Sequence, residues 1–410
     1  MDEMLVSAHS QAMTLLATRS QREQRGSARH GVAFWLIAAV FAVSLAFSTV
    51  PAPLYPLYQR QDGFSSFTVT IVFAVYAVGV IVSLLLAGRV SDWAGRRRIL
   101  LPALGLEIVA AVLFLTWPAL PGLILARFLT GLGVGLITAT ATAFLLELHT
   151  AHRPSAGRAR FEIVSAAANL GGLGTGTLVA GALAQFAPAP LRTPYLVFLI
   201  LLALSVAAVA AVPETVIAPA VRPPYRPQRV RVTGSALVPA AAAFAAFAVF
   251  GLFTSLAPGF VAGSLHHPGR LLAGAVTFLV FAAGAAAQSA FRPRLRAGLL
   301  TLAAGLVIVA AATQLTSLAL FLTGGALAGA GAGVVFKSAV GATVAASAAH
   351  ERGASLAGLF LIAYLGLVGP VLGLGVATRT VPATTAMLWF TGFLLTLLAA
   401  IAVLDRFRRS

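Results

Sequence analysis

The sequence predicts an all-α protein that crosses a membrane twelve times, built as two six-helix halves related by pseudo-symmetry. Three observations support this fold class. Of the 410 residues, 59% are hydrophobic and 10% are charged, whereas a soluble domain carries about 25% charged residues. The basic residues fall unequally on the two sides of the expected membrane, and features of the first half recur in the second. A soluble enzyme of two or three domains is therefore excluded.

The apolar sequence accommodates twelve spans. A membrane-spanning helix needs roughly 20 predominantly apolar residues, and twelve of them use nearly all the apolar sequence of this chain. We expect the spans at 32–57, 67–88, 98–118, 120–146, 161–186, 194–212, 235–262, 270–290, 297–314, 317–345, 354–377 and 384–404.

Polar segments divide these spans into halves. Residues 1–31 run into the first apolar stretch without a small-residue cleavage site, as expected of a cytoplasmic tail before an uncleaved span. The longest polar segment between spans is rich in Pro and Arg and separates six spans from six. The sequence therefore predicts one half at 32–212, a cytoplasmic central loop at 213–234, a second half at 235–404 and a cytoplasmic tail at 405–410.

The 28 basic residues, against 11 acidic ones, predict the orientation. With both termini on one side of the membrane, 22 of the basic residues lie on that side, 4 lie on the other and 2 lie within spans. Basic residues accumulate in cytoplasmic loops, so we expect both termini in the cytoplasm. Because these basic residues lie in short loops between spans, their role in orienting the spans explains the positive net charge, and a nucleic-acid partner is not needed to explain it. The chain has no cysteine, which excludes disulfides and thiolate sites.

The two halves repeat three features at offsets of about 196 to 206 residues. Hydroxyl residues precede prolines near the ends of spans 1 and 7, glycine triplets occur in spans 4 and 10, and basic turns follow spans 2 and 8. The residues are Ser48-Thr49 and Thr254-Ser255, then Gly131/Gly133/Gly135 and Gly329/Gly331/Gly333, then Arg96/Arg97/Arg98 and Arg292/Arg294/Arg296. This order indicates a duplicated six-helix unit, as in transporters built from parallel repeats around a midplane cavity.

The turn between spans 2 and 3 reads Gly88-Arg-Val-Ser-Asp92-Trp-Ala-Gly95-Arg96-Arg97-Arg98. It resembles the signature loop of the major facilitator superfamily, Gly-x-x-x-Asp-x-x-Gly-Arg-Lys/Arg. The resemblance implies a conformational latch between the halves, in which Asp92 meets the start of span 11 near Gly353 in the outward-facing state. A helix N-terminus stabilises such a negative charge. Glu147, at the cytoplasmic end of span 4, is the expected ion-pair partner of Arg96 or Arg97.

Span 4 contains Arg127-x-x-x-Gly131-x-Gly133, which is similar to a fourth-helix motif of this superfamily associated with proton coupling. A buried Arg costs about 2.5 kcal/mol or more in hydrocarbon, so it needs a cavity or a partner. Glu107 is the one acid near the midplane, at a similar depth on span 3. The pair Glu107 and Arg127 is therefore expected to act either as a structural salt bridge or as the proton-coupling pair.

Span 5 departs from the superfamily's antiporter motif, Gly-x-x-x-Gly-Pro-x-x-Gly-Gly. It reads Gly172-x-x-x-Gly176-Thr177-x-x-Ala180-Gly181, so Thr177 replaces the proline and Ala180 one glycine. The small residues still permit close helix contact. The missing proline weakens an assignment to export by antiport without excluding it.

In this superfamily helices 1, 4, 7 and 10 line the cavity, with 2, 5, 8 and 11 beside them. The resemblance therefore predicts substrate-cavity residues Ser48, Thr49, Tyr55, Tyr76, Asn169, Thr254, Gln288 and Lys337. Each of these side chains can alternatively serve helix packing, and Lys337 can extend toward the cytoplasm. No motif for a metal or a cofactor occurs.

The sequence thus predicts a secondary active transporter, not an enzyme, that moves a small organic solute by alternating access with proton coupling. Few embedded charges and many apolar, aromatic and hydroxyl residues favour a largely uncharged or amphipathic solute and efflux. The alternative is a proton-linked importer of a carboxylate or sugar-like solute. A polytopic membrane enzyme would need an acid-rich loop, and residues 213–234 contain one acid, Glu214. We expect a monomer in a bacterial cytoplasmic membrane.

Overall fold

The computed structural model describes residues 29–87, 90–216, 227–228, 230–231, 236–291, 294–348 and 351–407. These residues form helices and connections, with no strand among them. Twelve helical segments of this described part are long and apolar enough to cross a membrane. The all-helical, twelve-span architecture expected from the sequence is therefore confirmed.

The first six spans differ from simple helices at two places. Span 1, Arg29–Asp62, changes at η1 (Ala52–Leu54) to the short α2 (Tyr55–Asp62), because prolines at 51 and 53 supply no backbone N–H. Span 5 consists of α7 (Ala159–Ala166), the π-helical η2 (Ala167–Gly171) and α8 (Gly172–Phe186). The others are α3 (Ser66–Ala87), α5 (Arg96–Thr116), α6 (Leu120–His152) and α9 (Thr193–Ala211), with the one-turn α4 (Ser91–Ala94) between α3 and α5.

The second six spans repeat the break of span 1. Span 7 consists of α10 (Leu237–Ser255) and α11 (Ala257–Gly263), which meet just before Pro258. The others are α12 (Arg270–Ala290), α13 (Leu295–Gln314), α14 (Leu318–Ala345), α15 (Arg352–Ala377) and α16 (Ala383–Phe407). Proline thus interrupts spans 1 and 7 at matching depths, as the repeated sequence predicts.

The glycine triplets hold equivalent helix pairs together in the two halves. A Cβ added at Gly131 of α6 would lie 2.0 Å from the Tyr76 carbonyl oxygen of α3, and one added at Gly329 of α14 would lie 2.2 Å from that of Val280 in α12. Backbones approach this closely only where no side chain intervenes. The pairs of spans 2 and 4, and of spans 8 and 10, are therefore packed in the same way.

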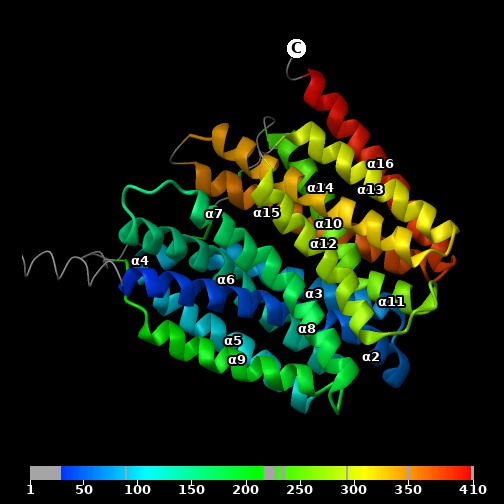
Figure 1. The fold of residues 1–410 in the computed structure, drawn as a ribbon, viewed down its shortest axis with the longest axis horizontal. Coiled ribbons are helices and arrows are strands. Elements are labelled where there is room, and N and C mark those ends of the chain that lie inside the picture. The colour runs from blue at the N-terminus through cyan, green and yellow to red at the C-terminus, as the bar shows by residue number, and fades with distance from the viewer. Residues whose placement is uncertain are drawn as a thin grey trace, which may run out of the picture.

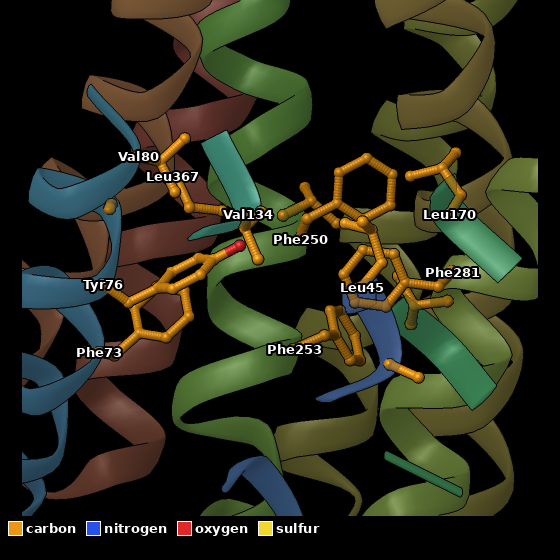
Figure 2. Packing of buried hydrophobic residues seen from close by; sticks show 14 of the residues in the cluster. Leu45, Phe73, Tyr76, Val80, Val134, Leu170, Phe250, Phe253, Phe281 and Leu367 are labelled. Atoms are coloured by element: carbon orange, nitrogen blue, oxygen red, sulfur yellow. The ribbon is translucent and has the colours of Figure 1, made fainter. Parts of the chain in front are cut away.

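The two halves lie side by side in Figure 1, with the blue-to-green helices of the first half on one side and the yellow-to-red helices of the second on the other. They meet where α8 packs against α12 and α3 against α15. We call the end of the bundle that contains Arg96, Arg153, Arg296 and Arg352 the Arg-rich end, and the other the opposite end. Buried aliphatic and aromatic side chains fill the helix interfaces, including Leu45, Phe73, Phe250 and Phe281 (Figure 2).

Candidate functional site

Arg127 lies in the interior of the first half with 1% of its surface exposed. Its Nη1 donates a hydrogen bond of 2.6 Å to the Ser48 carbonyl oxygen of span 1, and its Cζ lies 4.4 Å from the centroid of the Tyr76 ring. Its Nε has no hydrogen-bond partner. Its partners are thus one carbonyl oxygen and the π-electron density of a neighbouring ring.

Glu107 is fully buried on α5, and neither carboxyl oxygen has a hydrogen-bond partner. The side chain lies against α6 at Gly133, where an added Cβ would lie 2.8 Å from the Glu107 Cγ. Ser44 of span 1 faces this carboxyl group, and the Ser44 hydroxyl also lacks a partner.

The direct pairing of Glu107 with Arg127 expected from the sequence is wrong for this structure. The reason is the register of α5 against α6. Glu107 packs at Gly133, six residues and therefore about 9 Å along α6 from Arg127. The two side chains lie in the same half, and Tyr76 of α3 interacts electrostatically with both.

The hydroxyl candidates of span 1 are occupied by helix contacts. Ser48 donates to the Leu45 carbonyl at 2.7 Å, within its own helix. Thr49 donates to the Leu173 carbonyl of α8 at 2.7 Å, which ties span 1 to span 5. In the second half, Thr254 donates to the Phe250 carbonyl at 2.7 Å. In this structure the three hydroxyl groups thus donate to backbone carbonyls within or between helices.

The three other candidates of the first half are Tyr55, Tyr76 and Asn169. The buried Tyr55 and Tyr76 lie on the two sides of the Arg127 environment, and Tyr76 points from α3 into the bundle with its hydroxyl toward Val134 (Figure 2). Half-buried Asn169 lies in the π-helical turn of span 5. A π-helical turn often marks a functional position. Their role as substrate-cavity residues stays a prediction.

Lys337 and Gln288 are brought together, but through the backbone. The Lys337 ammonium group donates a hydrogen bond of 2.7 Å to the Gln288 carbonyl oxygen in the last turn of α12. Carbonyls in the last turn of a helix have no intrahelical donor and attract cations. Lys337 therefore stabilises the end of α12 in this structure, and its role in binding a solute stays a prediction.

At the Arg-rich end, the signature turn is joined to α6. The Arg96 Nη2 lies 2.7 Å from Glu147 Oε1, and the Arg96 Nη1 donates to Ser91 at 2.7 Å. The structure thus places the Arg96–Glu147 ion pair where the sequence predicts one. Arg97 instead donates to the Ala210 carbonyl of α9 at 2.6 Å. Gly88 and the Asp92 side chain lie outside the described part, so the latch itself stays a prediction.

Sequence reasoning missed Glu214, which follows α9. Its carboxylate accepts hydrogen bonds from the Arg96 and Arg97 backbone N–H groups at 2.9 and 3.0 Å, and so caps the first turn of α5. A Cβ at Gly95, whose φ is 106°, would lie 2.8 Å from Glu214 Oε2. Glycine is thus needed there for both its backbone conformation and the space. The sequence contained a signal for this cap, because Glu214 is the one acidic residue in the Arg-rich central loop.

Sequence reasoning also passed over a cluster of aromatic side chains in the second half. Phe250 stacks on Phe281 with centroids 4.9 Å apart, and Phe247 lies 5.0 Å from Phe336 and 5.4 Å from Tyr364. These residues come from α10, α12, α14 and α15. Phe247, Phe336 and Tyr364 are only half-buried.

Among the described residues, no group of three His, Asp or Glu side chains could hold a metal ion.

The comparisons agree with this architecture. The model of the Major Facilitator Superfamily matches residues 35–296, which is more than half of the chain. The chain belongs to the major facilitator superfamily. It is accordingly a multi-pass membrane transporter and not an enzyme.

Individual relatives are similar over short segments. An uncharacterized MFS-type transporter of Mycobacterium tuberculosis is 30% identical over 151 residues, 37% of this chain and 25% of that protein. The multidrug resistance protein MdtL of Escherichia coli is 40% identical over 78 residues, 19% of this chain and 20% of MdtL. The chain thus matches a quarter or less of the length of these two relatives.

A solved structure shows the same fold over nearly the whole length. The human organic anion transporter MFSD10 matches with a TM-score of 0.63 and 16% identity, covering 91% of this chain and 99% of MFSD10. At this identity the likeness concerns the fold alone.

Proposed function

We propose that this superfamily member exports a small, largely uncharged or amphipathic organic solute from a bacterial cell, in exchange for protons and as a monomer. The observation that carries the proposal is the composition of the interior. The aromatic cluster of the second half and the tyrosines beside Arg127 offer stacking surfaces and hydroxyls, while the one second-half cation within a span, Lys337, is engaged by a backbone carbonyl. The local similarity to a multidrug resistance protein supports the same direction of transport.

Proton coupling is assigned to Glu107. A buried carboxylate without a counter-ion is strongly disfavoured in an apolar interior, so we assign to Glu107, which faces Ser44 of span 1, the role of proton carrier. Arg127 provides a full positive charge on the adjacent helix. A shift of α5 along α6 that brought these long side chains together would favour release of the proton.

A screen followed by a flux measurement tests the proposal. A bound solute raises the unfolding temperature by mass action, so purified protein is first screened against metabolites and drugs. Compounds that stabilise it are then offered to everted vesicles. An exporter accumulates them when the lumen is acidic and loses them on addition of a protonophore. Accumulation that requires an acidic exterior would contradict export, and accumulation unaffected by protonophore would contradict proton coupling.

No observation favours the carboxylate importer. Such a transporter needs a cation free to meet the carboxylate, and the two cations that the sequence places deep within spans are engaged: Arg127 with Ser48 and Tyr76, and Lys337 with Gln288.

A further inference from the structure

The contact between α8 and α12 joins the two halves through their backbones. A Cβ added at Gly274 of α12 would lie 2.2 Å from the Thr177 carbonyl oxygen, and one added at Gly181 of α8 would lie 2.6 Å from that of Arg270. Nearer the middle of the bundle, Gly174 of α8 lies against Phe278 and Phe281. The helices run antiparallel, and this contact extends from the middle of the bundle to the opposite end.

Three hydrogen bonds cross between the halves along this contact. The fully buried Thr177 hydroxyl shares its one proton between the Gly174 carbonyl of its own helix at 2.7 Å and the Gly274 carbonyl of α12 at 3.0 Å. The Arg270 backbone N–H donates to Gln185 Oε1 at 3.0 Å, and the Arg270 Nη1 donates to the Ala184 carbonyl at 2.7 Å. Each bond must break if α8 and α12 separate.

A second contact between the halves lies at the same end. A Cβ added at Gly375 near the end of α15 would lie 2.4 Å from the Thr70 hydroxyl oxygen near the start of α3. The Arg379 guanidinium lies 5.3 Å from the Phe67 ring. At the Arg-rich end, by contrast, the described hydrogen bonds from Gln228 to Leu85 and from Arg231 to Ala354 pass through the central loop. Among the described residues, the closest backbone contacts between the halves thus run from the middle of the bundle to the opposite end, while α7 also touches α12 nearer the Arg-rich end.

We propose that Thr177 is a gating residue, whose hydrogen bond to Gly274 holds the opposite end closed in this conformation. Thr177 occupies the position of the proline in the antiporter motif. Its hydroxyl donates a hydrogen bond that a proline ring, which has no donor, cannot make. Thr177 acts by positioning α8 against α12. The proposal does not depend on the solute, the coupling ion or the direction of transport.

The test measures access to a reporter in the otherwise cysteine-free chain. Ala273→Cys places a thiol beside Gly274 at a position that is 3% exposed, and its labelling by a maleimide in detergent reports opening of the contact. Thr177→Val removes the donor at nearly constant volume. A hydrogen bond between membrane helices contributes about 0.6 kcal/mol on average, so labelling should become about threefold faster.

Two matched variants make the result specific. Thr177→Ser keeps a donor and should label at the parent rate. Thr175→Val removes an exposed hydroxyl that bonds only to Gly171 within its own span, and should also leave the rate unchanged. Parent-like labelling of Thr177→Val, or equal acceleration in Thr177→Ser or Thr175→Val, would overturn the proposal.

A variant at a different bond guards against a folding defect at position 177. Gln185→Leu removes the acceptor of the Arg270 N–H, and should accelerate the labelling of Ala273→Cys in the same direction. Gel filtration and the unfolding temperature verify that each variant is folded. If Thr177→Val does not fold, unchanged labelling in folded Gln185→Leu overturns the proposal.

Discussion

At the scale of residues, the first half contains an acidic side chain, Glu107, and a basic one, Arg127. Both are buried, and they do not form an ion pair. Arg127 is held by Ser48 and Tyr76, whereas Glu107 lies against Gly133 with both oxygens unpartnered. Breaking a buried ion pair is costly, but two separate sites can change their protonation and pairing as helices shift. This separation is therefore more compatible with a coupling role than a fixed salt bridge would be.

Glu107→Gln tests that role. The amide is neutral and similar in shape, so the variant should fold, bind solute and exchange it across the membrane. Proton-driven accumulation in vesicles should be lost, because no proton can be carried at this position. Glu162→Gln, at an exposed position in the first turn of α7, is the control and should pump like the parent. Parent-like accumulation by Glu107→Gln would assign coupling to another group.

Glu214→Ala tests the cap on α5. The change removes an exposed acceptor that binds the N–H groups of Arg96 and Arg97, and loss of a cap at a helix N-terminus costs about 0.5–2 kcal/mol. We expect a lower unfolding temperature in detergent, while Glu162→Ala should leave it nearly unchanged. An equal effect of the two substitutions would show that the cap has no energetic importance.

At the scale of elements, glycines determine which helices can touch. Gly131→Ala inserts a methyl group 2.0 Å from the Tyr76 carbonyl oxygen and must push α3 from α6. Gly105 of α5, by contrast, has no neighbour within 4 Å of an added Cβ. Gly105→Ala should be neutral or stabilising by up to about 1 kcal/mol, because alanine favours helix. A comparison of folded yield and unfolding temperature separates the two, and similar behaviour of both variants would contradict the packing described.

The loop between α3 and α5 carries the prediction of the latch. If Asp92 meets the start of α15 only in the outward-facing state, Asp92→Asn should shift the population inward-facing and slow transport while expression stays near normal. A single cysteine in the outer vestibule should then react more slowly than in the parent protein. Equal labelling rates would show that Asp92 does not act as a latch.

At the scale of the whole molecule, the repeated sequence predicted the fold well. Hydrophobicity located all twelve spans, and the matched prolines and glycine triplets predicted which breaks and close contacts recur. The site was less predictable. Depth along a helix placed Glu107 and Arg127 near each other, but the register of α5 against α6, which the sequence does not contain, sets Glu107 against Gly133 instead. The same limit concealed the cap at Glu214 and the bond from Thr177 to Gly274.

The central claim is that the two halves rock against each other, so that closure alternates between the two ends. Spin labels measure this directly in the cysteine-free chain. One pair, Ala151→Cys with Ala346→Cys, follows α6 and α14 at the Arg-rich end. The other, Gln61→Cys with Thr380→Cys, follows α2 and the end of α15 at the opposite end.

The measurement is the distance distribution of each pair by pulsed electron paramagnetic resonance, in the parent and in Thr177→Val. Alternating access predicts that the variant lengthens the distance at the opposite end and shortens the distance at the Arg-rich end, by exchange between two populations. Distances that stay single and unchanged at both ends, or that lengthen at both ends together, would contradict the account.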